Sequence, residues 1–533
     1  MNPICPFKSV AQNIFLLALV LSLGLHEAQG QLKPQGRYEK EVKSSDNGFT
    51  LVSLDVNGIA LIHEQDKFLS GKKLWEVIIL GPDLKERWQS DIEVKSGFSL
   101  MGYDYTENHA YFLFREGDKD FNKFNLVQIN ISTYAIQYFE INHEFSFRIT
   151  HFSVVGKNAI FGGYVGREPT VIIYETTTQG LKVIPGFFLK DTELLDVRVN
   201  NNSTFNTLLI ERNSLDKRHL VMKTFDQTGA LLLEDYIEIE KDKNILTGIS
   251  SGLKREELII IGTYTEGATN IGLGFYSVMV DPFSEQKIRY TPFTNLNYLL
   301  GYLPEKRAAR IKAKSKERLD MGKSPDYKAH LLPIRIYEAN EGFYFLSEMY
   351  DPASTNNRPY WNNYNNNPFY GYGYSPYGYN PAMNRYATTP YSYNNTNQGS
   401  TAKMLESVLT LFDPNGKLIW DSSLKFENIK KYAPEQSSDF VVKNELILSM
   451  YKKEKELIVN TGSIREEPEL DTLSIPLLNT ADVIRSESED DTGIRHWYGN
   501  NVFVWGYQSL RDKGKNEGDP FRYVFYINKF EAE

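Results

Sequence analysis

One short motif in the chain matches a hydrolase signature. The stretch GISSG at Gly248–Gly252 has the G-x-S-x-G form, in which a serine sits on a sharp turn between a strand and a helix, so that its hydroxyl projects toward oxyanion-binding N–H groups. Here the next apolar run, LIIIG from Leu258, predicts another strand. No alternation of strands and helices elsewhere supplies a catalytic α/β domain, so we do not assign Ser250 as a nucleophile.

Two acidic segments are the other candidates for chemistry. The segment DKDFN at Asp118–Asn122 begins like a calcium loop, but Lys123 stands where an EF-hand needs Gly and Ile129 where it needs Glu. The acidic run at 487–491 could hold a hard cation between structural units, yet it has no counter-ligand beside it, and a solvated linker is the better interpretation. No two histidines after residue 30 have the i, i+4 spacing of a helical metal pair. The sequence therefore predicts no catalytic residue, no metal site and no cofactor.

The first 30 residues predict export. Lys8 precedes an unbroken apolar run from Ile14 to Leu25, and the small residues Ala28 and Gly30 fit a signal-peptidase site. This run is too short to cross a hydrocarbon core of roughly 30 Å. We expect a signal peptide over 1–30 and a mature chain over 31–533 without a transmembrane segment, located in the periplasm, at the cell surface or outside the cell.

Composition narrows the function further. The single cysteine, Cys5, lies in the leader, so the mature chain has no disulfide and no thiolate ligand. Lys and Arg number 59 and Asp and Glu 68, a formal net charge of −9, which disfavours a nucleic-acid partner. Hydrophobic residues make up 41% of the chain, enough for a sizeable core.

One pattern recurs eight times: a polar turn doublet, then five or six mostly apolar residues rich in β-branched and aromatic types. Such runs predict short strands that are buried on both faces. They begin at Ile59, Ala110, Ala159, Thr207, Leu258, Phe343, Leu446 and Val502. The steps between them are 51, 49, 48, 51, 85, 103 and 56 residues, and removing 303–328 and 352–400 brings every step to between 48 and 59.

A strand, a tight polar turn and another strand follow most of these runs. Asp226, Asp281 and Asp413 open three of the turns, where an aspartate side chain bonds the backbone two residues on. Four antiparallel strands per unit of about 50 residues predict an all-β propeller, because one blade alone cannot bury its faces. We predict a single domain of eight four-stranded blades, with seven as the alternative; two tandem β-domains or a solenoid is the competing architecture. The last unit shows only three clear strands, so we expect Arg37–Lys43 to supply the fourth and close the ring.

Two insertions interrupt the repeat. Within 303–328, the segment Leu303–Gly322 predicts a helix, and Glu305–Lys323 carries eight Lys or Arg against three acids. This helix is either a solvated charged surface or a docking site for an acidic partner, lipid headgroups or an anionic glycan. The second insertion, 352–400, has twelve Asn, ten Tyr and six Pro but no Val, Ile or Leu, which predicts a disordered loop. It is either a tolerated low-complexity segment or an aromatic arm that stacks on a polysaccharide or a protein.

The order strand, Asp, turn, Gly-Lys, strand and Trp occurs in LTLFDPNGKLIWDS at Leu409–Ser422 and, more loosely, in ILGPDLKERWQSDI at Ile79–Ile92. This order resembles the blade signature of pyrroloquinoline-quinone-type propellers. The resemblance implies eight blades, in a family that includes periplasmic dehydrogenases and non-enzymatic scaffolds of outer-membrane assembly. The dehydrogenases are implied least, because their vicinal cysteine pair has no equivalent here. The richness in Asn, Lys and Tyr resembles exported proteins of Bacteroidota.

Together these features predict a non-catalytic propeller that acts as a binding or scaffolding module in the bacterial envelope, with an envelope protein or a glycan as its partner. The expected partner-binding residues lie in the two insertions: Arg307, Arg310, Lys312, Lys314, Trp361, Tyr372 and Tyr374. The alternative is a propeller-type glycoside hydrolase or polysaccharide lyase, with carboxylates and a histidine gathered from several blades at the channel mouth. A structural lattice or secretion-system component is the third interpretation.

Overall fold

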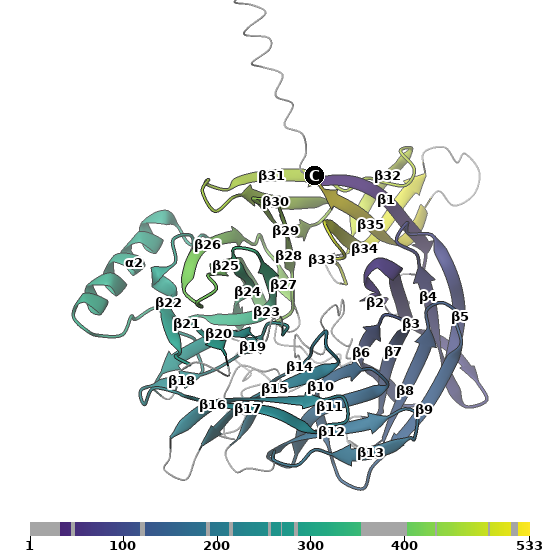
Figure 1. Cartoon of the computed structure of the whole chain (residues 1–533). Helices are drawn as coiled ribbons and strands as arrows, with labels where there is room; N and C mark the ends of the chain where they lie inside the picture. Colours follow the sequence, from purple (N-terminus) through teal and green to yellow (C-terminus); the bar gives the residue numbers. More distant parts are fainter. Residues whose placement is uncertain are drawn as a thin grey trace, which may run out of the picture.

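Eight antiparallel sheets form a closed ring in the computed structural model of the chain (Figure 1). The structure describes residues 32–43, 48–117, 123–187, 192–212, 217–253, 257–267, 269–281, 286–352, 402–431, 434–488, 491–512 and 521–533. The predicted signal peptide, and the calcium-like segment 118–122, lie outside these residues. Eight blades are present, as the spacing of the apolar runs predicts, and not seven.

The strands of each blade follow one another from the inside of the ring to the outside. Blade 1 contains β2 (Thr50–Ser53), β3 (Ile59–Leu69), β4 (Lys72–Leu80) and β5 (Glu86–Lys95), and the short helix η1 (Asp55–Asn57) joins its first two strands. Blade 2 contains β6 (Phe98–Thr106), β7 (His109–Glu116), β8 (Lys123–Asn130) and β9 (Ile136–Asn142). Blade 3 contains β10 (Arg148–Val155), β11 (Asn158–Val165), β12 (Glu168–Glu175) and β13 (Gly180–Val183). Blade 4 contains β14 (Glu193–Val199), β15 (Thr204–Arg212), β16 (Arg218–Asp226) and β17 (Leu231–Glu238).

The second half of the ring has the same order with small irregularities. The inner strand of blade 5 is split into β18 (Lys243–Ile245) and β19 (Ile249–Ser250), followed by β20 (Leu258–Glu266), β21 (Gly274–Val280) and β22 (Arg289–Pro292). Blade 6 contains β23 (His330–Ala339), β24 (Gly342–Pro352), β25 (Ala402–Phe412), β26 (Leu418–Lys425) and the two-residue β27 (Lys430–Lys431), which pairs with β25. Blade 7 contains β28 (Ser438–Lys443), β29 (Leu446–Lys453), β30 (Glu456–Gly462) and β31 (Glu469–Ser474).

Blade 8 is built from both ends of the described chain. Its inner strand is split into β32 (Asp482–Glu487) and β33 (Gly493–His496), followed by β34 (Asn501–Asp512) and β35 (Phe521–Ala532), and β1 (Leu32–Glu41) forms the outer edge. β1 pairs with β35 from Leu32 opposite Ala532 to Glu41 opposite Val524. The predicted closure is thus confirmed, but the strand begins at Leu32, before the predicted Arg37. The sequence does not predict this part of the strand, because Pro34 and Gly36 are unfavourable inside strands. In the structure a bulge between them accommodates both residues at the sheet edge.

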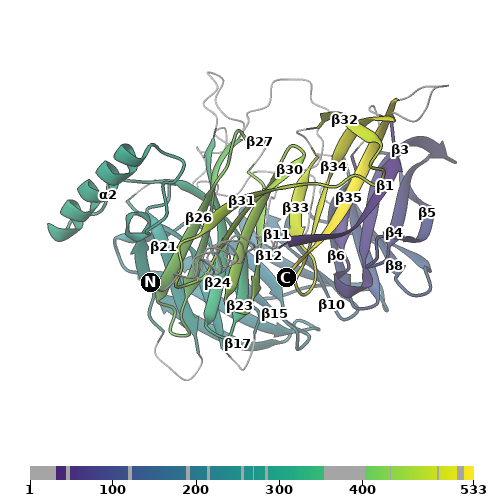
Figure 2. The same ribbon diagram turned by 90° about the horizontal axis from the view of Figure 1, so that it is seen from above.

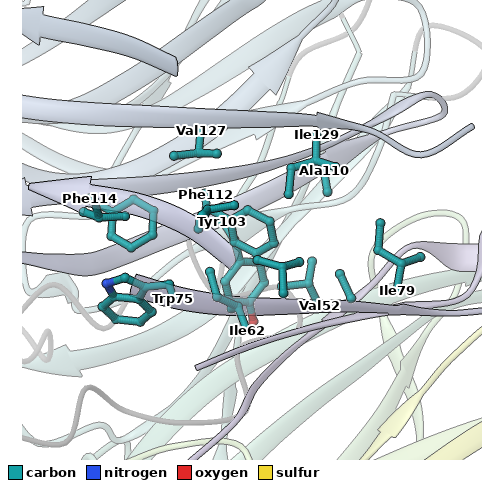
Figure 3. Packing of buried hydrophobic residues seen from close by; sticks show 14 of the residues in the cluster. Val52, Ile62, Trp75, Ile79, Tyr103, Ala110, Phe112, Phe114, Val127 and Ile129 are labelled. Atoms are coloured by element: carbon teal, nitrogen blue, oxygen red, sulfur yellow. The ribbon is translucent and has the colours of Figure 1, made fainter. Parts of the chain in front are cut away.

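The eight apolar runs of the sequence all lie on the second strand of a blade: β3, β7, β11, β15, β20, β24, β29 and β34. These strands lie inside their sheets, and the apolar runs they carry are almost wholly buried, because a blade packs against a neighbour on each face. Separate apolar clusters fill the spaces between consecutive blades. Figure 3 shows the cluster between blades 1 and 2, where Ile62 and Trp75 face Phe112 and Phe114. A cluster between blades 8 and 1, which includes Trp505 and Leu61, completes the circle.

Two of the predicted aspartate turns are confirmed. Asp226 Oδ1 accepts hydrogen bonds from the N–H groups of Thr228 (2.8 Å) and Ala230 (2.9 Å). Asp413 Oδ1 accepts from Asn415 (2.9 Å) and Lys417 (2.8 Å) in the same way. The turn after Asp281 lies outside the described residues.

The basic insertion contains the helix α2 (Glu305–Asp320), preceded by the short helix η2 (Phe293–Asn295). Pro304 caps the start of α2, and Gly322, just past its end, has a positive φ of 70°, as a helix stop requires. None of the helices in the described part of the chain is long and apolar enough to cross a membrane.

Candidate functional site

Both insertions leave the ring at the same face. Strands alternate in direction within a blade, so the connection from the second strand to the third and the connection from the fourth strand to the next blade emerge at one end. α2 lies in the second kind of connection, between β22 and β23, and 353–401 lies in the first kind, between β24 and β25. The two roots are adjacent: His330 pairs with Tyr350, and their rings are 5.4 Å apart. We call this side of the ring the insertion face.

α2 is docked on the ring by one apolar face. Ala308 and Ile311 pack against the cluster between blades 5 and 6, which includes Leu296, Leu299 and Leu300. The Lys312 ammonium turns inward and donates to the main-chain oxygen of Asn297. In both views α2 lies at the outer edge of the ring and not over its centre (Figures 1 and 2). The helix is therefore a fixed part of the surface, with one side left facing solvent.

Two buried carboxylates hold the chain that leads into α2. Glu406 Oε1 accepts a hydrogen bond from the Leu300 N–H (2.9 Å). Asp421 accepts from the N–H groups of Asn297 (2.9 Å) and Tyr298 (2.7 Å). Burial raises the pKa of Glu406 to about 7, although main-chain N–H groups and the nearby Lys312 charge oppose the rise. Burial likewise raises the pKa of Asp421, against the same kinds of opposing contacts.

The solvent side of α2 carries a group of cations. Lys306, Arg307 and Arg310 are exposed, and among the described residues no ion pair involves them; we call them the α2 basic cluster. Arg310 follows Lys306 by four positions and Arg307 by three, so all three share one side of the helix. Like charges at these spacings destabilise a helix by about 0.2–0.5 kcal/mol per pair, and cations in the first turn oppose the helix dipole. Local stability therefore does not explain this cluster.

The other predicted binding residues are placed differently. Lys314 is exposed but lies 2.6 Å from Asp326, so its charge is partly balanced. Lys312 faces the ring, as described above. Trp361, Tyr372 and Tyr374 lie outside the described residues.

A second group of cations lies at the root of the long insertion. Lys403, two residues after its end, pairs directly with Lys430 across β25 and β27, and both residues are exposed. Like charges directly opposite each other destabilise a sheet. Among the described residues no ion pair involves Lys403 or Lys430, so in this part of the chain the insertion face carries two separate arrangements of unpaired positive charge, on a protein whose formal net charge is −9.

Glu348, on β24, is another enclosed carboxylate near this root. It is fully buried and accepts hydrogen bonds from the N–H groups of Ser437 (2.9 Å) and Ser438 (2.7 Å) and from the Ser438 hydroxyl (2.7 Å). Burial raises its pKa to about 7, opposed by these donors and by the charge of Arg495. A carboxyl with this pKa has the acidity of a catalytic acid. Its enclosure and its bonds to the main chain of blade 7 assign it instead to fastening blades together.

The inner strands are fastened to one another in a similar way. Aspartates on three inner strands accept a hydrogen bond from a main-chain N–H of the next blade: Asp104 from Val154 (2.7 Å), Asp196 from Ser250 (3.1 Å) and Asp439 from His496 (2.8 Å). Arg335 adds an ion pair to Asp439 (2.7 Å), which lowers the pKa of that carboxyl in spite of its burial. These aspartates lie on inner strands, and each already uses one carboxylate oxygen to hold the next blade.

The motifs that could have carried out chemistry have structural roles instead. Ser250 lies on β19, is buried, and is followed by the strand β20 and not by a helix, so the hydrolase elbow is absent. The prediction of a solvated linker is wrong for Glu487, the first residue of the acidic run. Its carboxylate lies 2.5 Å from Lys452 Nζ, and both side chains are buried. Within the described residues, no cluster of three or more His, Cys, Asp or Glu is arranged to hold a metal ion.

Sequence reasoning missed the buried carboxylates Glu348, Glu406 and Asp439. A signal for two of them was present, since Glu348 and Glu406 each interrupt an otherwise apolar strand. Charged residues are almost never fully buried unless they are paired. An acid in such a run therefore predicts a hydrogen-bonded anchor, although its partner cannot be read from the sequence.

Comparison with known proteins finds only remote structural likeness. No protein-family model and no curated protein sequence matches the chain. Among solved structures, the polysaccharide lyase Uly1 is 8% identical, with 94% of this chain and 100% of that chain covered and a TM-score of 0.38. The Dos1 propeller is 10% identical, with coverage of 82% and 92% and a TM-score of 0.36. The β-propeller domain of the Trilobed protease from Pyrococcus furiosus is 10% identical, with coverage of 78% and 96% and a TM-score of 0.31. At these identities the likeness concerns the fold alone.

Proposed function

We propose that this protein is a non-catalytic binding propeller of the bacterial envelope that holds an acidic polysaccharide on its insertion face. The observation that carries the proposal is the α2 basic cluster. Lys306, Arg307 and Arg310 destabilise their own helix, yet the helix is fixed to the ring by buried anchors. An arrangement that is locally unfavourable and globally held in place is typical of a functional surface.

The partner's chemistry follows from the geometry of the charges. Lys306 and Arg310 are one helical turn apart, about 6 Å along the axis, and Lys403 and Lys430 add a second pair on the same face. Cations one helical turn apart match a linear polymer that carries one carboxylate per sugar unit. Trp361, Tyr372 and Tyr374 of the long insertion stay predicted as aromatic contacts that stack on such a polymer.

Calorimetric titration with polygalacturonate, and with neutral dextran as the reference, tests the proposal. In 0.1 M NaCl we expect saturable binding of polygalacturonate only, at least tenfold (about 1.4 kcal/mol) weaker in the double variant Arg307→Glu/Arg310→Glu. Raising NaCl to 0.4 M should weaken binding strongly, because exposed charges are screened.

The matched control is Lys157→Glu/Lys417→Glu. These two exposed lysines lie in turns at the opposite face of the ring, and the charge change is the same. We expect the control to bind as the wild type does. Equal weakening in both double variants would show a general effect of net charge, and absence of polygalacturonate binding would refute the proposal.

A further inference from the structure

A polar cleft lies between blades 1 and 2 on the insertion face. Its volume is about 240 Å³, and its described lining residues are Lys95, Phe98, Glu116, Lys123, Phe124, Asn125, Glu140 and Asn142. All of them lie at strand ends that open on the insertion face: the end of β5, the start of β6, and the adjoining ends of β7, β8 and β9. α2 lies on the opposite side of the ring (Figure 1), so the cleft is separate from the α2 basic cluster.

The strand register directs the polar side chains into this cleft. Asn125 pairs with Phe114 on one side and with Glu140 on the other. Phe114 belongs to the apolar cluster between blades 1 and 2, where its ring is 5.1 Å from that of Trp75 (Figure 3). Paired residues point to the same face of a sheet, so Asn125 and Glu140 also face blade 1. The cleft is the polar continuation of this inter-blade core.

Asn125 is the unusual group in the cleft. Asn125 is only 5% exposed, and its Oδ1 is buried with no hydrogen-bond partner among the described residues. A buried amide oxygen without a partner costs about 1–3 kcal/mol. Such groups in native proteins call for an explanation. Because Asn125 lines the cleft, a ligand seated there is in a position to supply the missing donor.

The remaining lining groups define the ligand's charge. Lys95 Nζ lies 2.8 Å from Glu140 Oε2, and Lys123 Nζ lies 2.8 Å from Glu116 Oε2. The charges of the described lining residues therefore cancel in pairs, which disfavours an ionic ligand. The paired carboxylates can still accept hydrogen bonds, and the paired ammonium groups can still donate them. A hydroxyl group both donates and accepts, so it can bind to either kind of group.

We propose that this cleft binds one neutral sugar ring, with a ligand hydroxyl donating to Asn125 Oδ1. A volume of about 240 Å³ is below the roughly 300–1,000 Å³ of drug-sized pockets, so it suits a single ring and not a chain. Hydroxyls donate to Glu116, Glu140 and Asn125 and accept from Lys95. The ring of Phe98, which also belongs to the apolar cluster, supplies an apolar wall for the C–H face of the sugar. This site does not depend on the proposed binding of an acidic polymer by α2.

Titration of the whole protein with D-glucose, D-galactose, D-mannose and N-acetyl-D-glucosamine, followed by calorimetry and by saturation-transfer NMR, tests the inference. We expect saturable binding of at least one of them. Asn125→Leu, which keeps the side-chain size but removes the amide, should weaken that binding at least tenfold. Its melting temperature should equal or exceed that of the wild type, because an unpartnered buried polar atom has been replaced by an apolar one.

Two further variants keep the result interpretable. Lys95→Ala, at the rim of the cleft, should weaken sugar binding severalfold even if Asn125→Leu changes stability. Lys217→Ala is the matched control: Lys217 forms an exposed ion pair with Glu238 (2.7 Å) at the same face of blade 4 and should leave binding unchanged. Sugar binding should also be insensitive to 0.4 M NaCl, unlike binding at α2. The inference is overturned if none of the four sugars binds saturably, or if Asn125→Leu and Lys95→Ala both bind as the wild type does.

Discussion

The stability of the ring should depend on pH through Glu348. This carboxyl is fully buried between blades 6 and 7, and burial raises its pKa from 4.5 to about 7. At pH values between 4.5 and 7, Glu348 is protonated in the folded protein but ionised in the unfolded chain. The free energy of unfolding therefore falls as the pH rises from 4.5 to 7. A rise in pKa of this size corresponds to about 3 kcal/mol.

Glu348→Gln isolates this effect. Glutamine has the shape of the protonated carboxyl and keeps one oxygen for the N–H groups of Ser437 and Ser438, but it does not titrate. We expect the variant's free energy of unfolding to approach the wild-type value at pH 5. Relative to the wild type it should then gain up to about 3 kcal/mol by pH 8. The histidines whose pKa burial lowers, His151 above all, affect both proteins equally and cancel in this difference.

Urea unfolding followed by tryptophan fluorescence at pH 5, 6, 7 and 8 measures the difference. Glu107→Gln, at an exposed turn, is the control and should run parallel to the wild type. Glu406→Gln should reproduce the Glu348→Gln profile independently, since burial raises its pKa to about 7 as well. If wild type and Glu348→Gln stay parallel within about 0.5 kcal/mol from pH 5 to 8, the reasoning is refuted.

Three other changes probe how the ring is held together. Arg335→Met leaves Asp439 buried without its counter-charge and should lower the free energy of unfolding by about 3–5 kcal/mol. Adding Asp439→Asn should restore at least half of this loss, as measured by urea unfolding in a double-mutant cycle. Purely additive effects of the two substitutions would contradict this. Replacing 353–401 with a two-residue turn should raise stability by about 3 kcal/mol, because each halving of a loop returns about 0.6 kcal/mol, and a lower urea midpoint would argue against a passive connection. Deleting residues 1–41 removes β1 and exposes the edge of β35; light scattering should detect aggregation, and a stable folded monomer would contradict the closure argument.

Much of the fold could be predicted because its signals are local. The second strand of each blade is buried on both faces wherever it lies in the ring, so its apolar run can be recognised without knowing its partners. The closure by the N-terminal strand followed from counting strands. The first residue of this strand could not be predicted. Pro34 and Gly36 indicate a break in a strand unless the strand is known to be a bulged edge strand.

The candidate sites were less accessible to sequence reasoning. The basic helix was predicted from composition, but its docking rests on Glu406 and Asp421, which are 106 and 123–124 residues away from the main-chain groups they hold. The cleft between blades 1 and 2 left no sequence signal. Asn125 lies in the run KFNLVQIN, where an asparagine is unremarkable until the register places it beside Phe114 and Glu140.

Blade 6 combines the two features that a presenting surface needs. The long insertion leaves and rejoins this blade, and the α2 connection, which starts on blade 5, ends on it. Each face of blade 6 carries a buried carboxylate, Glu348 toward blade 7 and Glu406 toward the α2 connection. Irregular backbone cannot be packed against a core unless its N–H groups find acceptors. A carboxylate supplies several acceptor positions at once and so fixes an irregular segment without a further strand. The anchors thus let the chain leave the repeat, form α2 and return to β23 while the cations of the helix keep one orientation toward solvent.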